Sequence, residues 1–170
     1  ILVHKAVQLL HRGAEIKRIL FVCFNLTLCN YIQRLLSAKG VALGAGGVEV
    51  CSFFDLCGNI LGESIDHANP DGDYYKTVID LTMQELKKCR FKYDAILVDE
   101  GQDFSDNMFR VIVSLLNRST NNLTIAMDDN QNIYRQNRSW KKLDIRVSGR
   151  HSHTLKFVYR HTVELTRFYN

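Results

Sequence analysis

The chain has 170 residues, of which 46% are hydrophobic and 24% charged, with a net charge of +4 at pH 7, and this composition is typical of one soluble domain. No apolar run approaches the roughly 18 residues that a membrane-spanning helix needs, and His4 and Lys5 interrupt the N-terminal apolar stretch too early for a secretion signal. We therefore expect no membrane or export function, and a cytoplasmic protein.

In the first third of the chain, the spacing of apolar residues alternates between helical and strand patterns. Residues 4–12 have apolar side chains at helical spacing before Gly13, whereas the apolar run at 18–24 is typical of a strand buried in a parallel sheet. Asn25 is expected to cap a helix that continues through Leu36 and ends before Gly40. A glycine-rich turn at 44–47, with no lysine after it, precedes a second apolar strand at 48–54.

The rest of the chain continues this alternation. Residues 58–73 contain glycine, Pro70 and four acidic residues, which predicts a loop or a small insertion. We predict helices at 77–89 and 108–116, and buried strands at 93–98, 123–127 and 154–158. Apolar strands that alternate with amphipathic helices predict a doubly wound α/β fold with a mostly parallel sheet.

Charge is segregated along the chain. Residues 1–54 carry +4, residues 55–106 carry −7, residues 107–130 balance, and residues 131–170 carry +7. Basic residues with interleaved aromatic residues, as in this last block, suit the phosphates and bases of a nucleic acid. A solvated basic face on a larger protein explains the same pattern equally well.

The five cysteines are odd in number and form no CxxC pair. They lie within or beside apolar runs, which favours reduced buried thiols over a disulfide framework or a zinc site. A reducing, intracellular setting is therefore expected.

In an open parallel sheet, ligands bind just beyond the carboxyl ends of the strands, and the strongest signal there is Asp99-Glu100, after the strand at 93–98. One such carboxylate can hold Mg²⁺, usually through its waters, while the next polarises an attacking water. Two adjacent acids at a strand end are also explained as a helix N-cap and first-turn pair, and for an isolated pair that structural explanation is favoured.

Two later residues fit the same chemistry. Gln131 follows the strand at 123–127, beside Asp128 and Asp129, and its amide is suited to sense a phosphate oxygen. A turn rich in Asn and Asp explains this segment equally well. Arg160 follows the strand at 154–158 and is either a surface arginine or a group that stabilises charge on a γ-phosphate.

Taken in chain order, five segments resemble motifs of the first motor domain of superfamily 1 helicases of the UvrD/Rep type. Residues 21–28 (FVCFNLTL) resemble motif Ia, and residues 50–57 (VCSFFDLC) resemble the short DNA-contacting motif that follows it. Residues 98–104 (VDEGQDF) resemble motif II, residues 127–135 (MDDNQNIYR) motif III, and residues 157–162 (FVYRHT) part of motif IV. The resemblance covers nearly the whole chain.

This resemblance implies a RecA-like P-loop NTPase fold, a three-layer α/β/α arrangement with a mostly parallel sheet. Residues 1–170 would form a single partial helicase domain, with a short insertion around 58–92 and the start of the connection to a second motor lobe near 160–170. The implied activity is that of an ATP-dependent helicase or translocase, with ATP and Mg²⁺ as cofactors.

The resemblance also assigns a role to each residue of the nucleotide site. Asp99 would coordinate the Mg²⁺ of ATP, and Glu100 would orient the hydrolytic water. Gln131 would sense the γ-phosphate, and Arg160 would stabilise the charge on it. Gln102 would couple the nucleotide site to the strand site.

A single nucleic-acid strand, DNA in preference to RNA, is the partner that the resemblance implies. The residues expected along the strand are Phe24, Asn25, Ser52, Phe53 and Tyr134. Aromatic rings would stack on bases, for roughly 1 to 3 kcal/mol each, and Ser52 would meet a phosphate. The second motor lobe of the same parent chain is the other implied partner.

Three departures from the family pattern qualify these expectations. The phosphate-binding sequence G-x-x-x-x-G-K-S/T is missing, although residues 1–12 resemble the helix that follows it, so we expect an inactive fragment that binds nucleotide poorly. Gln136 replaces a tryptophan that is common in the family, and the second lobe is missing. An alternative is a nucleic-acid-binding or regulatory module on an NTPase scaffold without turnover; a nuclease fits the acidic residues less well.

Overall fold

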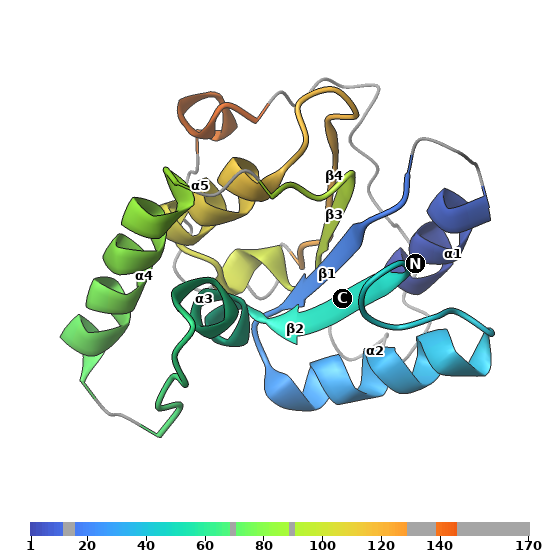
Figure 1. Ribbon diagram of the computed structural model, residues 1–170, viewed down its shortest axis with the longest axis horizontal. Helices are drawn as coiled ribbons and strands as arrows, with labels where there is room; N and C mark the ends of the chain where they lie inside the picture. Colours follow the sequence, from blue (N-terminus) through green and yellow to red (C-terminus); the bar gives the residue numbers. More distant parts are fainter. Residues whose placement is uncertain (12–15, 69–70, 89–90, 129–138, 146–170) are drawn as a thin grey trace, which may run out of the picture. The chain divides into compact units, whose positions relative to one another are not determined.

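Four short apolar strands form a parallel sheet in the order β2-β1-β3-β4 (Figure 1). They are β1 (Ile19–Cys23), β2 (Val48–Ser52), β3 (Ala95–Val98) and β4 (Asn122–Ile125). In the register, Ile19 lies beside both Val48 and Ala95. Every residue of β1 and β3 is buried, as their uninterrupted apolar sequences predict for central strands.

The computed structural model of the protein describes residues 1–11, 16–68, 71–88, 91–128 and 139–145. The chain divides into two compact units, Ile1–Arg138 and Ser139–Asn170. In the second unit, the described residues include the short 3-10 helix η3 (Trp140–Leu143). The strand predicted at 154–158 lies outside the described residues, and a single partial domain over 1–170 stays a prediction.

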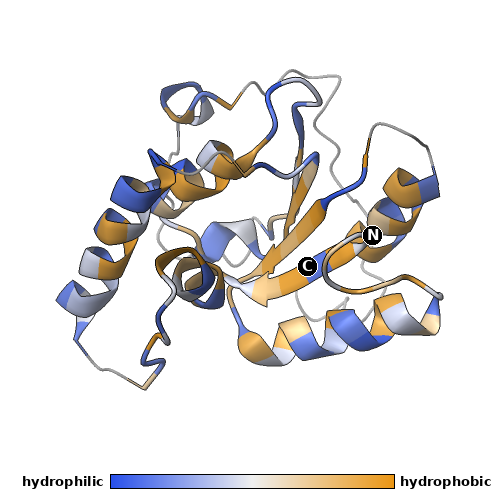
Figure 2. Cartoon of the chain, viewed as in Figure 1, coloured by the Kyte–Doolittle hydropathy of each residue, from blue (hydrophilic) through white to orange (hydrophobic). Residues whose placement is uncertain are grey.

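Helices cover both faces of the sheet, which confirms the α/β/α layering. Helices α1 (Leu2–His11) and α2 (Leu26–Ala38) lie on one face, and α3 (Phe53–Leu61), α4 (Gly72–Leu86) and α5 (Asp106–Leu115) lie on the other (Figure 1). Figure 2 shows that β1 and β3 are hydrophobic, while the helices carry hydrophilic residues on their outer surfaces. Among the described residues, no helix is both long and apolar enough to cross a membrane.

The helices begin where side chains accept hydrogen bonds from free backbone N–H groups. Asn25 Oδ1 accepts the N–H of Thr27 at 2.7 Å, which confirms the predicted cap of α2. Ser105 Oγ accepts the N–H of Met108 at 3.3 Å and caps α5 in the same way. These caps place each helix directly after a strand or a short turn.

The structure contains a helix, α3, that the sequence did not predict. It begins within the strand predicted at 48–54 and ends within the loop predicted at 58–73. The strand predicted at 48–54 ends at Ser52, because the Ser52 hydroxyl accepts the N–H of Asp55 at 3.1 Å and starts α3 at Phe53. Part of the loop predicted at 58–73 belongs to α3 and α4. Gly58, taken as a loop residue, is a packing residue, since an added Cβ would lie 2.6 Å from the Glu63 carbonyl oxygen.

Asp94 joins three segments at the start of β3. Its Oδ2 accepts the N–H groups of Lys17 and Arg18 at 2.9 and 3.0 Å, and its Oδ1 accepts Nδ2 of Asn117 at 3.1 Å. Burial opposes ionisation, but the hydrogen bonds from Lys17, Asn117 and Arg18 together hold the pKa of Asp94 below its ordinary value. The carboxylate thus fixes the entry of both central strands.

We predict that Asp94→Asn lowers the free energy of unfolding by about 1 kcal/mol at pH 7, because the hydrogen bonds lose their charged acceptor. A folded-state pKa below the unfolded value means that this stabilisation is present above about pH 4 and is lost as the pH falls through the folded-state pKa. Urea titrations from pH 7 to pH 3 measure the difference, with Asp80→Asn on the exposed face of α4 as the control. Equal effects of the two substitutions would contradict this role.

Candidate functional site

The chain order of the strands creates a switch point between β1 and β3. From β1 the chain passes to β2 on one side, and from β3 it passes to β4 on the other, so the connections diverge at the carboxyl ends of β1 and β3. Such points are where open α/β sheets bind ligands. Phe24 and Asn25 follow β1 here, and Asp99 and Glu100 follow β3.

Asp99 and Glu100, the acid pair, are held on both sides by backbone hydrogen bonds that continue past the end of β3. The N–H of Asp99 donates to the Val22 carbonyl oxygen at 3.0 Å, toward β1. The N–H of Gly101 donates to the Ala126 carbonyl oxygen at 2.8 Å, toward the end of β4. The two carboxylates are therefore carried by an extension of the sheet rather than by a free loop.

Glu100 has a left-handed backbone, with φ 52° and ψ 46°. This conformation is uncommon for a residue with a side chain and costs roughly 1 kcal/mol or more. It turns the chain from β3 directly into the 3-10 helix η1 (Gly101–Asp103). Both Asp99 and Glu100 remain half-buried at the edge of the sheet, where their side chains stay accessible to a ligand.

Gly101 packs closely against the end of β4 and the residues that follow it. A Cβ built at this position would lie 2.6 Å from Cγ2 of Ile125 and 3.0 Å from Cγ of Met127. These contacts are shorter than packed carbon atoms allow, so any side chain at 101 would push η1 away from the end of β4.

Gln102 connects the acid pair to the segment that follows β4. Its Nε2 donates to Glu100 Oε2 at 2.6 Å, and its Oε1 accepts the N–H of Asp128 at 3.0 Å. One amide thus links a side chain of the acid pair to the backbone just before residues 129–138. This geometry is consistent with the coupling role predicted for Gln102, which stays a prediction.

The site carries a concentration of negative charge. Burial raises the pKa of Asp103, and the nearby Glu100 carboxylate raises it further. Among the described residues, no group of three His, Cys, Asp or Glu side chains is arranged to hold a metal ion. One or two carboxylates suit Mg²⁺, which keeps several waters and binds substrate phosphates, so the donor set fits the predicted ion.

Aromatic rings pack beneath this edge of the sheet. Phe104 is buried, and its ring lies 6.0 Å from the ring of Phe24, 6.0 Å from Phe53 and 5.7 Å from Phe109. Phe24 is 43% exposed, so part of its ring is open to a ligand. Phe104 therefore connects the segment of the acid pair mechanically to the segment that carries Phe24.

The structure places the predicted strand-contacting residues in different environments. Phe53 is fully buried, between the rings of Phe54 and Phe104, so its own ring has no free face for a base. Ser52 is buried too, and its hydroxyl donates to Asp55 Oδ2 at 2.7 Å. Asn25 is exposed, with Oδ1 already accepting the N–H of Thr27.

Three predicted site residues lie outside the described residues: Gln131, Tyr134 and Arg160. Their convergence with Asp99 and Glu100 therefore stays a prediction. Sequence reasoning assigned no role to Gly101, Asp103 or Phe104, although the segment VDEGQDF contains all three. The signal in the sequence that could have identified these residues is the run of a small, an acidic and an aromatic residue directly after Asp99 and Glu100.

We predict that Gly101→Ala destabilises the fold by about 1 to 3 kcal/mol, because the new methyl group would overlap Ile125 and Met127. Chemical denaturation measures the change, and amide NMR shifts at residues 99–103 and 125–128 report where it occurs. Gly72→Ala is the control, since a Cβ there meets no atom within 4 Å. Equal stability of the two variants would show that η1 and β4 are not in close contact.

The family model described as "UvrD/REP helicase N-terminal domain" matches residues 73–146. No curated protein and no solved structure matches the chain. The matched span contains β3, Asp99, Glu100, Gln102 and Asp128, but not the site residues that follow β1 and β2. Over residues 73–146, the chain is therefore similar to the N-terminal domain of UvrD/REP helicases.

Proposed function

We propose that this chain is part of the first motor domain of an ATP-dependent helicase or translocase that moves along a single nucleic-acid strand, DNA in preference to RNA. One observation carries the proposal: Asp99 and Glu100 lie at the switch point of a parallel sheet, and Gln102 joins Glu100 to the backbone at Asp128. The family match over residues 73–146 supports the same class of protein.

The nucleotide would be Mg-ATP, which supplies the phosphoryl group that is transferred to water. Asp99, which is half-buried at the carboxyl end of β3, would hold the Mg²⁺, which keeps several water and phosphate ligands. Gln131 and Arg160, as the resemblance implies, would contact the γ-phosphate. A phosphate-binding loop and a second motor lobe would complete the site.

Glu100 is the proposed general base. Its carboxylate accepts a hydrogen bond from the Gln102 amide, which restricts the side chain to one orientation. The left-handed backbone at Glu100 and the Gly101 hydrogen bond to Ala126 restrict the main chain as well. A carboxylate held in this way can orient a water and accept its proton without first losing conformational freedom.

Gln102 is the proposed link between the nucleotide and the strand. Its second hydrogen bond is to the N–H of Asp128, which immediately precedes the segment with Gln131 and Tyr134. A shift of that backbone when a base stacks on Tyr134 would pull on the amide and change the position of Glu100. This route gives strand binding a direct effect on hydrolysis.

On the strand side, Phe24 offers the exposed aromatic surface. Leu26 and Met127 are also partly exposed, at 43% and 37%, and both follow strand ends at the same edge of the sheet. Ser52 and Phe53 would act as supports in this arrangement, because their side chains are buried at the start of α3, where the Phe53 ring packs on Phe104. Stacking on Phe24 would contribute roughly 1 to 3 kcal/mol per base.

We predict that Glu100→Gln lowers strand-stimulated ATP hydrolysis by about 10²- to 10⁴-fold, because the amide cannot accept the proton of the attacking water. The measurement uses a protein that joins this domain to a phosphate-binding loop and a second lobe. Asp80→Asn, on the exposed face of α4, is the matched control and should leave the rate unchanged.

An unchanged rate in Glu100→Gln would remove Glu100 from the reaction. A parent protein that binds single strands but shows no stimulated hydrolysis even with Glu100 intact would favour the non-hydrolysing module instead. The same pair of measurements, strand binding and hydrolysis, therefore separates the two functions.

We predict that Gln102→Ala lowers the stimulation of hydrolysis by single strands about tenfold while basal hydrolysis falls less, since the variant removes the hydrogen bonds to both Glu100 and Asp128. Steady-state rates with and without a saturating oligonucleotide give the ratio. Gln84→Ala, exposed on α4, serves as the control. Equal losses of basal and stimulated rates would show that Gln102 only supports Glu100.

A further inference from the structure

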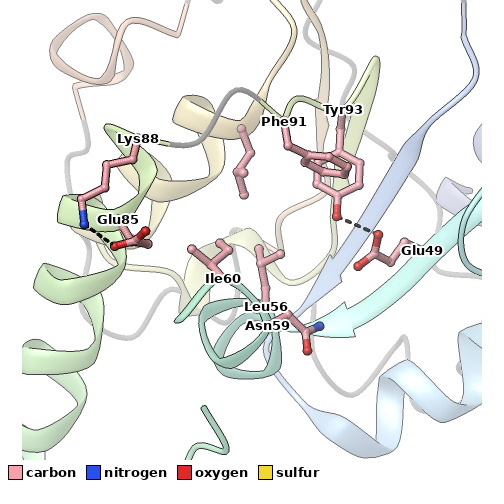
Figure 3. A pocket seen from close by; sticks show the side chains of 9 residues that line it. Glu49, Leu56, Asn59, Ile60, Glu85, Lys88, Phe91 and Tyr93 are labelled. Atoms are coloured by element: carbon pink, nitrogen blue, oxygen red, sulfur yellow. Dashed lines mark hydrogen bonds and ion pairs between the residues drawn. The ribbon is translucent and has the colours of Figure 1, made fainter. Parts of the chain in front are cut away.

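A cavity lies toward the amino ends of the strands, on the face covered by α3, α4 and α5 (Figure 3). Its volume is about 400 Å³, within the range of pockets that hold small molecules. It shares no lining residue with the acid pair: Glu49 lies beside Leu20 near the start of β1, and Tyr93 precedes β3. The helicase roles proposed above use none of its residues.

Apolar and aromatic side chains form part of the wall of this cavity. Leu56 and Ile60 extend from α3 into the space, and the ring of Phe91 lies across from them (Figure 3). Leu115 contributes from α5. Such a lining favours an apolar body in the ligand, because burial removes its surface from water.

One wall carries a carboxylate held by a tyrosine. The Tyr93 hydroxyl donates to Glu49 Oε2 at 2.7 Å (Figure 3). Burial raises the pKa of Tyr93, and the hydrogen bond to Glu49 raises it further, so the hydroxyl stays protonated as a donor. Tyr93 therefore fixes one oxygen of Glu49, and the rest of the carboxylate faces the cavity.

Two cations at this cavity, Arg18 and Lys88, are engaged with residues other than Glu49. The Arg18 guanidinium stacks on the Phe91 ring, 3.2 Å from its centroid, and Lys88 pairs with Glu85 at 2.9 Å. No ion pair joins Glu49 to a cation among the described residues. A ligand ammonium group could therefore donate a charge-assisted hydrogen bond to this carboxylate.

We propose that this cavity binds a small organic cation, a primary ammonium group on an apolar stem, with the ammonium on Glu49 and the stem between Leu56, Ile60 and Phe91. A phosphate-bearing ligand is disfavoured by Glu49, because the other two charged lining residues, Glu85 and Lys88, pair with each other. The ligand class follows from one fixed acceptor, an apolar wall opposite it, and a volume that suits a single small molecule.

The experiment titrates the chain with 2-phenylethylammonium and follows the binding by amide NMR. We expect saturable shifts at Glu49, Asn59 and Tyr93, and weaker binding of the uncharged analogue 2-phenylethanol by about tenfold or more, since it lacks the charge-assisted hydrogen bond. Glu49→Gln keeps the shape and the acceptor for Tyr93, and should weaken 2-phenylethylammonium by a similar factor.

A second variant tests the same contact without altering a buried residue. Asn59 lines the cavity and is exposed, so Asn59→Lys adds an internal ammonium group that competes for Glu49, whereas Asn59→Gln adds none. We expect Asn59→Lys to weaken the probe about tenfold and Asn59→Gln to leave it unchanged. No saturable shifts at millimolar probe, equal binding of the uncharged analogue, or unaltered affinity in both Glu49→Gln and Asn59→Lys would overturn the proposal.

Discussion

The candidate site depends on the backbone hydrogen bonds that extend the sheet beyond the last residue of β3. The N–H of Asp99 donates to Val22 in β1, and the N–H of Gly101 donates to Ala126 at the end of β4. Between these two anchors, Glu100 adopts a left-handed backbone that a loose turn would not maintain. The position of both carboxylates is thus a consequence of sheet pairing, and the absence of a side chain at Gly101 makes that pairing possible.

From this anchor, two kinds of contact extend outward. The Gln102 amide is polar and directional, and it reaches the backbone after β4. The Phe104 ring is apolar, and it packs against Phe24 after β1 and Phe53 at the start of α3. The ends of β1, β2 and β4 are therefore all in contact with the segment at residues 100–104. A site built in this way can transmit a small displacement, because neither a close-packed ring nor a paired amide can move without its partner.

The sequence predicted the central strands, the Asn25 cap and the acid pair, because each depends on local features: an apolar run, a capping side chain, or charges placed directly after a strand. The helix α3 was missed since Phe53-Phe54 extends an apolar run and Gly58 suggests a loop, whereas the cap at Ser52 and the close contact of Gly58 with Glu63 depend on the folded chain. The burial of Phe53 and the pairing of Glu49 with Tyr93, 44 positions apart, are also tertiary features that no local pattern reveals.

We propose that Asp99, Glu100, the amide of Gln131 and the guanidinium of Arg160 surround one nucleotide at the switch point of the sheet. The most direct test is a crystal structure of this domain joined to a phosphate-binding loop and a second lobe, with Mg²⁺ and a non-hydrolysable ATP analogue. Our account predicts the metal on Asp99, and Glu100, Gln131 and Arg160 around the γ-phosphate. A nucleotide bound away from the carboxyl end of β3, or Gln131 and Arg160 directed away from it, would contradict the account.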